Sequence, residues 1–227
     1  MTRRAWTELV DMDDAISRVR TWVAECPTEA TLLPVEPASG RRALEALQVS
    51  TRSPMGAIAF HTGGLLVDGG WLRVLGGGSA ALPRTIDQWN DLDGAPRCEH
   101  GVLVADDAIG GFFAWFRSPQ TVHYLAPDTF EWEDLELGYS DWLAWCLSER
   151  MPAFYAELRW EGGEREVAAL AGDRGLHVSP PLIASGPPIG ERSRRAVPVE
   201  ELWSMALEIG AQLRDLPDGA QVQFTTK

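Results

Sequence analysis

Positive charge is scarce in this sequence. Its 227 residues include 20 lysines and arginines against 33 aspartates and glutamates, so the formal net charge is −13. A protein that binds nucleic acid without sequence preference needs a cationic face, because neutralising phosphates and releasing counterions supplies most of that affinity. The deficit excludes this class and argues against docking on anionic lipid. It suits a protein of the cytosol or one that meets a basic partner.

Cysteines and long apolar runs are also few. Cys26, Cys98 and Cys146 are odd in number and widely separated, so the sequence predicts no disulfide framework and no CxxC motif. Acidic residues interrupt the N-terminal segment where a secretory signal needs a continuous apolar stretch. No run approaches the ~20 apolar residues of a membrane helix. We therefore expect a cytoplasmic protein without a membrane span.

The short motifs that identify common catalytic sites are missing. The sequence contains no Gly-x-x-x-x-Gly-Lys-Ser/Thr phosphate loop, no His-Glu-x-x-His zinc motif and no Gly-x-Ser-x-Gly nucleophile elbow. None of the three cysteines has a cationic local setting that would activate its thiol. Only the triplet Cys98, Glu99 and His100 hints at a ligand cluster. We expect no catalytic residue, no metal site and no cofactor.

The hydrophobic periodicity predicts an α+β fold with a central antiparallel meander between N- and C-terminal helices. A turn over residues 53–56 is expected to lead into strands. Asp68-Gly69 is a strong hairpin signal, because a type I′ turn needs positive φ at both central residues and an Asp-Gly pair adopts this conformation readily. The expected strands span residues 57–62, 65–67, 70–75, 101–107, 109–116 and 121–126. The expected helices span residues 5–25 with a break near Asp13, 41–48, 83–90, 139–147, 151–163 and 199–214.

Two adjacent carboxylates, Asp106 and Asp107, end an apolar strand. Adjacent strand residues face opposite sides of a sheet, so the two cannot serve one acid/base site without a bulge. We expect one of them to stabilise the turn at residues 108–111 and the other to be solvated. Arg73 lies in an otherwise apolar strand and needs a carboxylate or carbonyl partner if it is buried. We predict that it pairs with Asp106 or Asp107.

Acidic and aromatic residues alternate over residues 130–136. Glu131, Trp132 and Glu133 are suited to recognise a basic partner, because aromatic residues anchor interfaces and complementary charge speeds encounter. A solvated helix face with two buried aromatics accounts for the same pattern.

A rival hypothesis from another class is an enzyme or small-molecule binder. Its pocket would be lined by Trp71, Arg73, Asp106, Asp107 and His123, with the carboxylates as acid/base groups and Arg73 holding an anionic substrate. Side chains that meet in an open cleft would favour this hypothesis.

Composition divides the chain into three parts. Residues 1–172 carry the core, residues 173–198 read as a partly extended surface excursion rich in Pro, Gly and Arg, and residues 199–227 read as a helix followed by an edge strand at 220–226. We expect the last part to pack on the same domain as the core.

The surface excursion contains the densest basic cluster, formed by Arg192, Arg194 and Arg195. Either these arginines keep a mobile loop soluble, or they pack against an acidic face such as Glu131–Glu136 of the same or a neighbouring subunit. The second alternative makes them candidate contacts of a homodimer.

Several segments follow one another in a characteristic order. They are LQVSTRSPMGAIAFHTGGLLVDGGWLRVLGGGS, Trp89-Asn90, LVADDAIGGFFA, YLAPDTFEWEDL, YSDWLAWCL and FYAELRW. In this order they closely resemble a bacterial family known as domain of unknown function 2625, over most of residues 1–172.

More loosely, the chain resembles the SUKH superfamily. The shared pattern is a helix, an antiparallel meander with a strand-end acid followed by Gly-Gly and an aromatic strand, and then helices. This resemblance implies an α+β fold without shared catalytic residues and, by analogy, binding of a toxin domain by an immunity-type protein. Our leading hypothesis is a non-catalytic, cytosolic protein-binding module for a basic toxin or another basic partner.

Overall fold

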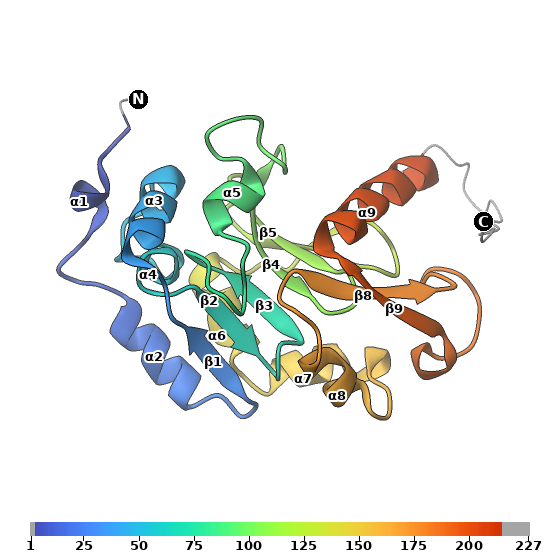
Figure 1. Cartoon of the computed structure of the whole chain (residues 1–227). Helices are drawn as coiled ribbons and strands as arrows, with labels where there is room; N and C mark the ends of the chain where they lie inside the picture. The colour runs from blue at the N-terminus through green and yellow to red at the C-terminus, as the bar shows by residue number, and fades with distance from the viewer. Residues whose placement is uncertain (1–2, 215–227) are drawn as a thin grey trace.

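An antiparallel meander of seven strands forms the centre of the fold (Figure 1). The computed structural model describes residues 3–214. Each strand pairs with the next one in the chain. The strands are β1 (Ala30–Leu33), β2 (Gly64–Val67), β3 (Leu72–Leu75), β4 (Gly101–Asp107), β5 (Phe112–Phe116), β6 (Val122–Leu125) and β7 (Trp132–Asp134). The predicted α+β class and the meander are confirmed.

The hairpin between β2 and β3 turns where the sequence predicts. Asp68, Gly69 and Gly70 have φ values of 54°, 63° and 90°. Aspartate and glycine tolerate this left-handed region better than other residues. Val67 pairs with Leu72, so the loop has four residues instead of the two of a type I′ turn.

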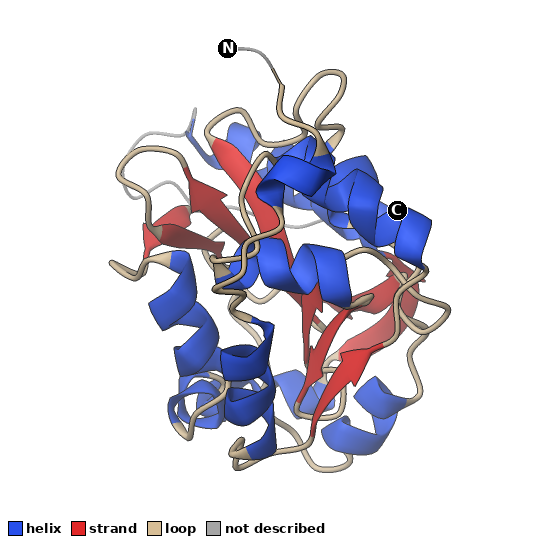
Figure 2. Cartoon of the chain, turned by 90° about the vertical axis from the view of Figure 1, so that its left-hand side faces the viewer, coloured by secondary structure: helices blue, strands red, loops and turns tan. Residues whose placement is uncertain are grey.

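Helices cover both faces of the sheet (Figures 1 and 2). On β5, the ring of Phe113 lies 5.5 Å from that of Trp142 of α6 (Tyr139–Cys146) and is tilted by 44°, whereas its neighbour Phe112 packs edge-on 5.0 Å from Trp203 of α9 (Val199–Arg214). Adjacent strand residues point to opposite faces, so α6 and α9 lie on opposite sides. The helices are α1 (Trp6–Leu9), α2 (Ile16–Ala24), α3 (Pro37–Leu47), α4 (Pro54–His61), α5 (Ile86–Asn90), α6 (Tyr139–Cys146), α7 (Arg150–Phe154), α8 (Gly163–Ala168) and α9 (Val199–Arg214), with short 3₁₀ helices η1 (Ala156–Leu158) and η2 (Ile189–Glu191).

Residues 54–61 form a helix, and the predicted turn and strand there were wrong. The side chain of Ser53 accepts a hydrogen bond from the N–H of Met55, and Pro54 occupies the first helical position, as at many helix starts. Helix α4 is buried from Pro54 to Ala59. A helix buried on all sides has no polar face, so its periodicity does not distinguish it from a buried strand.

The close contact between α3 and α4 depends on Gly40. A Cβ atom at this position would lie 2.3 Å from the carbonyl oxygen of Phe60, which belongs to the backbone and cannot turn aside. We expect Gly40→Ala to lower the free energy of unfolding by about 1–3 kcal/mol in urea denaturation, although alanine favours helices. The matched control is Gly138→Ala, because nothing lies within 4 Å of the added atom there. A Gly40→Ala variant as stable as its parent would contradict this packing.

Residues 173–198 contain a hairpin, whereas the composition of this segment predicted a partly extended surface excursion. Strands β8 (Arg174–Ser179) and β9 (Ser193–Pro198) pair along their whole length. The side chains of Leu176, Val178 and Val197 are buried. Most prolines and glycines of this segment lie in the connection between the strands, where they do not disturb the pairing. The prediction for α9 is confirmed, and the edge strand expected at residues 220–226 lies outside the described residues.

Candidate functional site

A buried ion cluster connects strands β3 and β4. Arg73 is paired with Asp106 in the strand register, and its guanidinium contacts that carboxylate. Arg84 Nη1 lies 2.5 Å from the second carboxylate oxygen, Asp106 Oδ2. All three side chains are buried, with at most 9% of their surface exposed. The predicted pairing of Arg73 is confirmed, whereas the expectation that one of the two carboxylates is solvated was wrong.

Both arginines of this cluster also bind the chain near the start of β8. Arg73 donates to the carbonyl oxygens of Asp107 and Arg174, and Arg84 donates to that of Gly172 at 3.1 Å. Burial lowers the pKa of Arg73, and the charge of Asp106 opposes that change. The cluster therefore uses its polar groups to join the meander to the C-terminal hairpin.

Asp107 points to the other face of the sheet and is completely buried. Its Oδ1 accepts hydrogen bonds from the N–H groups of Ile109 (3.0 Å) and Gly111 (2.8 Å). Its Oδ2 accepts from the hydroxyls of Tyr124 (2.7 Å) and Tyr155 (3.1 Å). Burial raises the pKa of Asp107, and the four hydrogen bonds oppose this. The prediction that one carboxylate stabilises the turn at residues 108–111 is confirmed.

Trp71 is 1% exposed and lies beneath the guanidinium of Arg159, which is 3.7 Å from the ring centroid and pairs with Asp68 at 2.5 Å. His123 stacks on Phe116 with ring centroids 3.9 Å apart, and its Nε2 lies 3.7 Å from Asp134.

The five residues of the predicted enzyme pocket therefore do not meet in an open cleft. At most 3% of the surface of Trp71, Arg73, Asp106 or Asp107 is exposed. A substrate would reach these four only if the side chains that cover them moved. The enzyme alternative stays a prediction.

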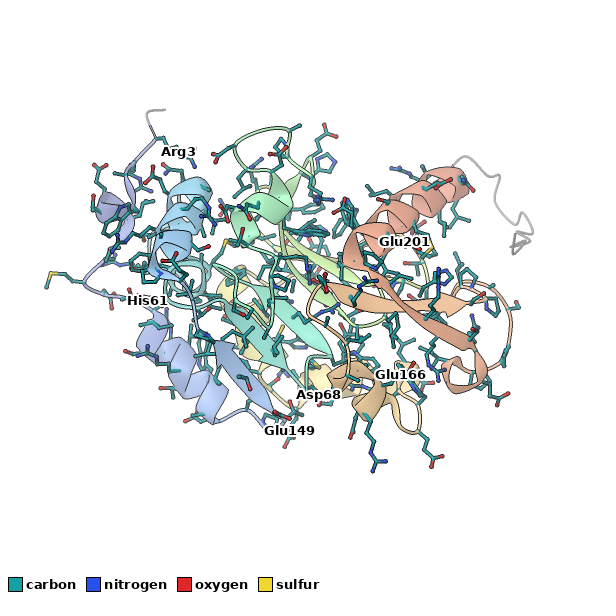
Figure 3. All side chains as sticks on the ribbon, in the orientation of Figure 1. Arg3, His61, Asp68, Glu149, Glu166 and Glu201 are labelled. Atoms are coloured by element: carbon teal, nitrogen blue, oxygen red, sulfur yellow. The ribbon has the colours of Figure 1, made fainter. Side chains whose placement is uncertain are left out.

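The three arginines of the basic cluster have partners near their own hairpin. Arg192 donates to the carbonyls of the β8–β9 connection. Arg194 pairs with Glu166 of α8 at 3.0 Å, and the mostly exposed Arg195 lies 3.6 Å from Glu201 of α9. Figure 3 labels these two glutamates on either side of the hairpin. Packing against Glu131–Glu136 of the same chain was therefore a wrong expectation, and the homodimer contact stays a prediction.

Exposed carboxylates gather around β7, the last strand of the sheet. We call this set the acidic edge; its members are Asp128, Glu131, Glu133, Asp134 and Glu136. Among residues 3–214, none of the five forms an ion pair with an arginine. The N–H of Glu136, the hydroxyl of Thr121 and the charge of His123 hold the pKa of Asp134 below its ordinary value. Residues 132–134 form a strand, so the helix face expected here was wrong.

An apolar groove lies beside the acidic edge, between β7 and the second half of α9. Its volume is about 290 Å³. Trp132 is half-buried in it, and 44% of Leu207 is exposed. We call this cavity the edge groove; it is lined by Leu125, Phe130, Glu131, Trp132, Ala206, Leu207, Gly210 and Arg214. The sequence pattern did not indicate the α9 side of this groove, where the local signal was Leu207 outside the apolar stripe of that helix.

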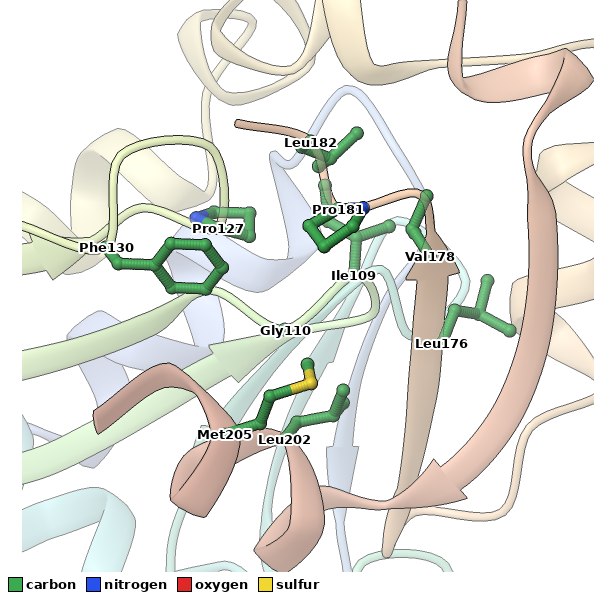
Figure 4. A pocket seen from close by; sticks show the side chains of 10 residues that line it. All are labelled: Ile109, Gly110, Pro127, Phe130, Leu176, Val178, Pro181, Leu182, Leu202 and Met205. Carbon is green, nitrogen blue, oxygen red and sulfur yellow. The ribbon is translucent and has the colours of Figure 1, made fainter. Parts of the chain in front are cut away.

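Two other cavities offer less to a partner. The one in Figure 4 lies between α9, β8 and the turn after β4, is lined by apolar side chains such as Leu176, Leu202 and Met205, and has room for about 20 Å³, or one water-sized solute. The other cavity lies beside Arg159 and Trp160 and has a volume of about 670 Å³. Three carboxylates and two guanidiniums line it, so its wall does not favour a ligand of one charge.

Residues 3–214 contain neither a grouped set of metal ligands nor a membrane-spanning helix. No three His, Cys, Asp or Glu side chains in this part of the chain are grouped so as to hold a metal ion. None of its helices combines the length and the apolar character of a membrane span.

Sequence comparisons place the chain among similar proteins. The family described as "Protein of unknown function DUF2625" matches residues 6–202. The chain is 34% identical over 212 residues to "Putative uncharacterized protein YbfG" of Escherichia coli (strain K12), covering 91% of this chain and 97% of that protein. It is 32% identical over 188 residues to an uncharacterized protein of Haemophilus influenzae, covering 79% and 82%. No solved structure matches. The expected likeness to the SUKH superfamily stays a prediction.

Proposed function

We propose that this chain, which belongs to the DUF2625 family, is a protein-binding module that recognises a basic partner through the acidic edge and the edge groove. One observation carries the proposal: five exposed carboxylates without an arginine partner among residues 3–214 surround a half-buried tryptophan. Aromatic side chains dominate the binding energy of many interfaces, and complementary charge mainly raises the association rate.

The buried charges support this choice by contrast. Asp106 and Asp107 each bind several groups of their own chain. The carboxylate oxygens of these two residues bind groups inside the fold, whereas the carboxylates of the acidic edge face solvent. A basic toxin domain of the kind that immunity proteins neutralise has the chemistry that this surface would recognise.

We expect neutralisation of the acidic edge to reduce binding of the basic partner. The test variant carries Glu131→Gln, Glu133→Gln and Glu136→Gln, and both it and the parent are used to capture proteins from the native bacterium at low and high salt. Capture of the partner should fall about tenfold at low salt in the variant, and binding to the parent should weaken as salt rises, because salt screens exposed charges.

The matched control carries Glu157→Gln, Glu161→Gln and Glu164→Gln, three exposed carboxylates on η1, α8 and the loop between them. It removes the same amount of charge and should capture the partner within about twofold of the parent. Equal losses in both variants would show a general effect of net charge. A partner whose capture ignores salt and all these substitutions would contradict the proposed function.

A further inference from the structure

The outer side of β7 has backbone groups that its sheet does not use. Within the β6–β7 pair, the N–H of Leu135 donates to the carbonyl of Val122 at 3.0 Å. Hydrogen-bonded pairs alternate along antiparallel strands, so the next such pair is Glu133 with Tyr124. The N–H and C=O groups of Trp132 and Asp134 must then point away from β6.

Nothing in the described part of the chain binds these four groups. No further strand pairs with β7 in the seven-stranded sheet. The turns on either side satisfy themselves, since Glu131 N–H donates to Thr129 and Glu136 N–H donates to the side chain of Asp134. Within residues 3–214, the outer backbone groups of β7 have no strand partner, and an open edge of this kind can accept an additional strand.

The side chains next to this open edge alternate in character. Trp132 pairs with Leu125 in the strand register, and both line the edge groove on the α9 side. Glu133 points to the opposite face, because successive strand side chains alternate. A strand added to β7 would place every second side chain beside the groove and the others on the face of Glu133.

We propose that β7 accepts an extended segment of another protein, in which basic and apolar residues alternate, as an eighth strand of the sheet. The apolar side chains enter the edge groove, and the basic ones lie on the face of Glu133. Main-chain hydrogen bonds supply affinity in this mode of recognition, and alternate side chains supply specificity. The inference rests on the proposed function and names the form of the partner.

A second copy of the chain is a poor occupant of the same edge. Two β7 strands paired antiparallel about Glu133 would place the two Glu133 side chains opposite each other, with Asp134 of each copy beside them. Like charges opposite each other destabilise a strand pair, and acidic side chains on an edge oppose self-association. The charge of the edge therefore selects a basic strand against its own kind.

Three synthetic peptides test this inference with the full chain. The first is acetyl-Lys-Val-Lys-Val-Lys-Val-Lys-amide; the second and third are N-methylated at the valines or at the lysines. In an extended peptide the N–H groups of the valines point to one edge and those of the lysines to the other, so only one of the two sets faces β7. Methylation removes the donor, so the peptide that is methylated on the facing set should bind about tenfold more weakly than the first peptide, and the other should bind within about twofold of it. In hydrogen exchange, the amides of Trp132 and Asp134 should become protected when the first peptide binds.

The outcomes separate this inference from the proposed function. Equal affinity of all three peptides would overturn strand addition and leave charge-dependent binding of a basic partner intact. No binding of the first peptide would also overturn it, whereas the proposed function is decided by capture of the partner. Protection of Trp132 and Asp134 without peptide would show that another segment or a second copy occupies the edge, which is likewise incompatible with strand addition.

Discussion

Asp106→Ala should lower the free energy of unfolding by about 3–5 kcal/mol, because it leaves two buried arginines without their carboxylate. Arg73 and Arg84 both contact Asp106, and each has less than a tenth of its side chain exposed. Urea denaturation of the parent and the variant measures the difference.

Two further variants identify the cause of that loss. Asp128→Ala removes an exposed carboxylate and should change stability by less than about 0.5 kcal/mol. Arg73→Met with Arg84→Met and Asp106→Leu replaces the charged groups by apolar ones and should recover part of the stability, since buried ion clusters are often no stronger than apolar packing. Recovery is incomplete because the carbonyls of Asp107, Gly172 and Arg174 lose their donors. An Asp106→Ala variant that loses less than about 1 kcal/mol would show that solvent reaches the arginines.

Asp107→Ala is expected to have an effect of similar size, about 3–5 kcal/mol, from a different cause. It removes the acceptor for four donors: two backbone N–H groups of the turn after β4 and the hydroxyls of Tyr124 and Tyr155. The double variant Tyr124→Phe with Tyr155→Phe keeps the turn and should lose less in the same urea measurement. If the double variant loses as much as Asp107→Ala, the turn contributes nothing.

The raised pKa of Asp107 also gives its contribution a definite dependence on pH. Burial makes the folded state hold this proton more strongly than the unfolded chain, whose aspartate has the ordinary value of 3.8. The resulting stabilisation is fully present below that value and is lost as pH rises through the higher folded pKa. The advantage of the parent over Asp107→Asn, which cannot titrate, should be larger near about pH 4 than near about pH 8. An advantage that grows with pH would mean that the hydrogen bonds outweigh burial.

Local chemistry explains which features could be predicted from the sequence. The left-handed turn at Asp68-Gly69 is encoded by the residues that adopt it, and the isolated Arg73 in an apolar strand needed a carboxylate or carbonyl partner once it was buried. The stripe of apolar residues from Val199 to Arg214 specified a helix with one buried face.

The missed features depend on contacts between distant segments. Helix α4 is apolar on all sides because its neighbours enclose it, so its periodicity carried no information. Arg84, which binds Asp106 from a loop 22 residues earlier, had no local signal. The edge groove brings Trp132 together with Leu207, and no pattern within either segment indicates that they meet.

The ion cluster also constrains when the nascent protein can complete its core. Arg73 donates to a carbonyl 101 residues later, and Arg84 to one 88 residues later. Contacts closed by such long loops form late, because the chain entropy must be lost before the contact forms. Until the ribosome has released the segment around Arg174, Arg73 and Arg84 have Asp106 as a partner but each lacks one carbonyl acceptor. A translation product that ends before this segment would keep an open, hydrated centre and would be degraded readily by cellular proteases.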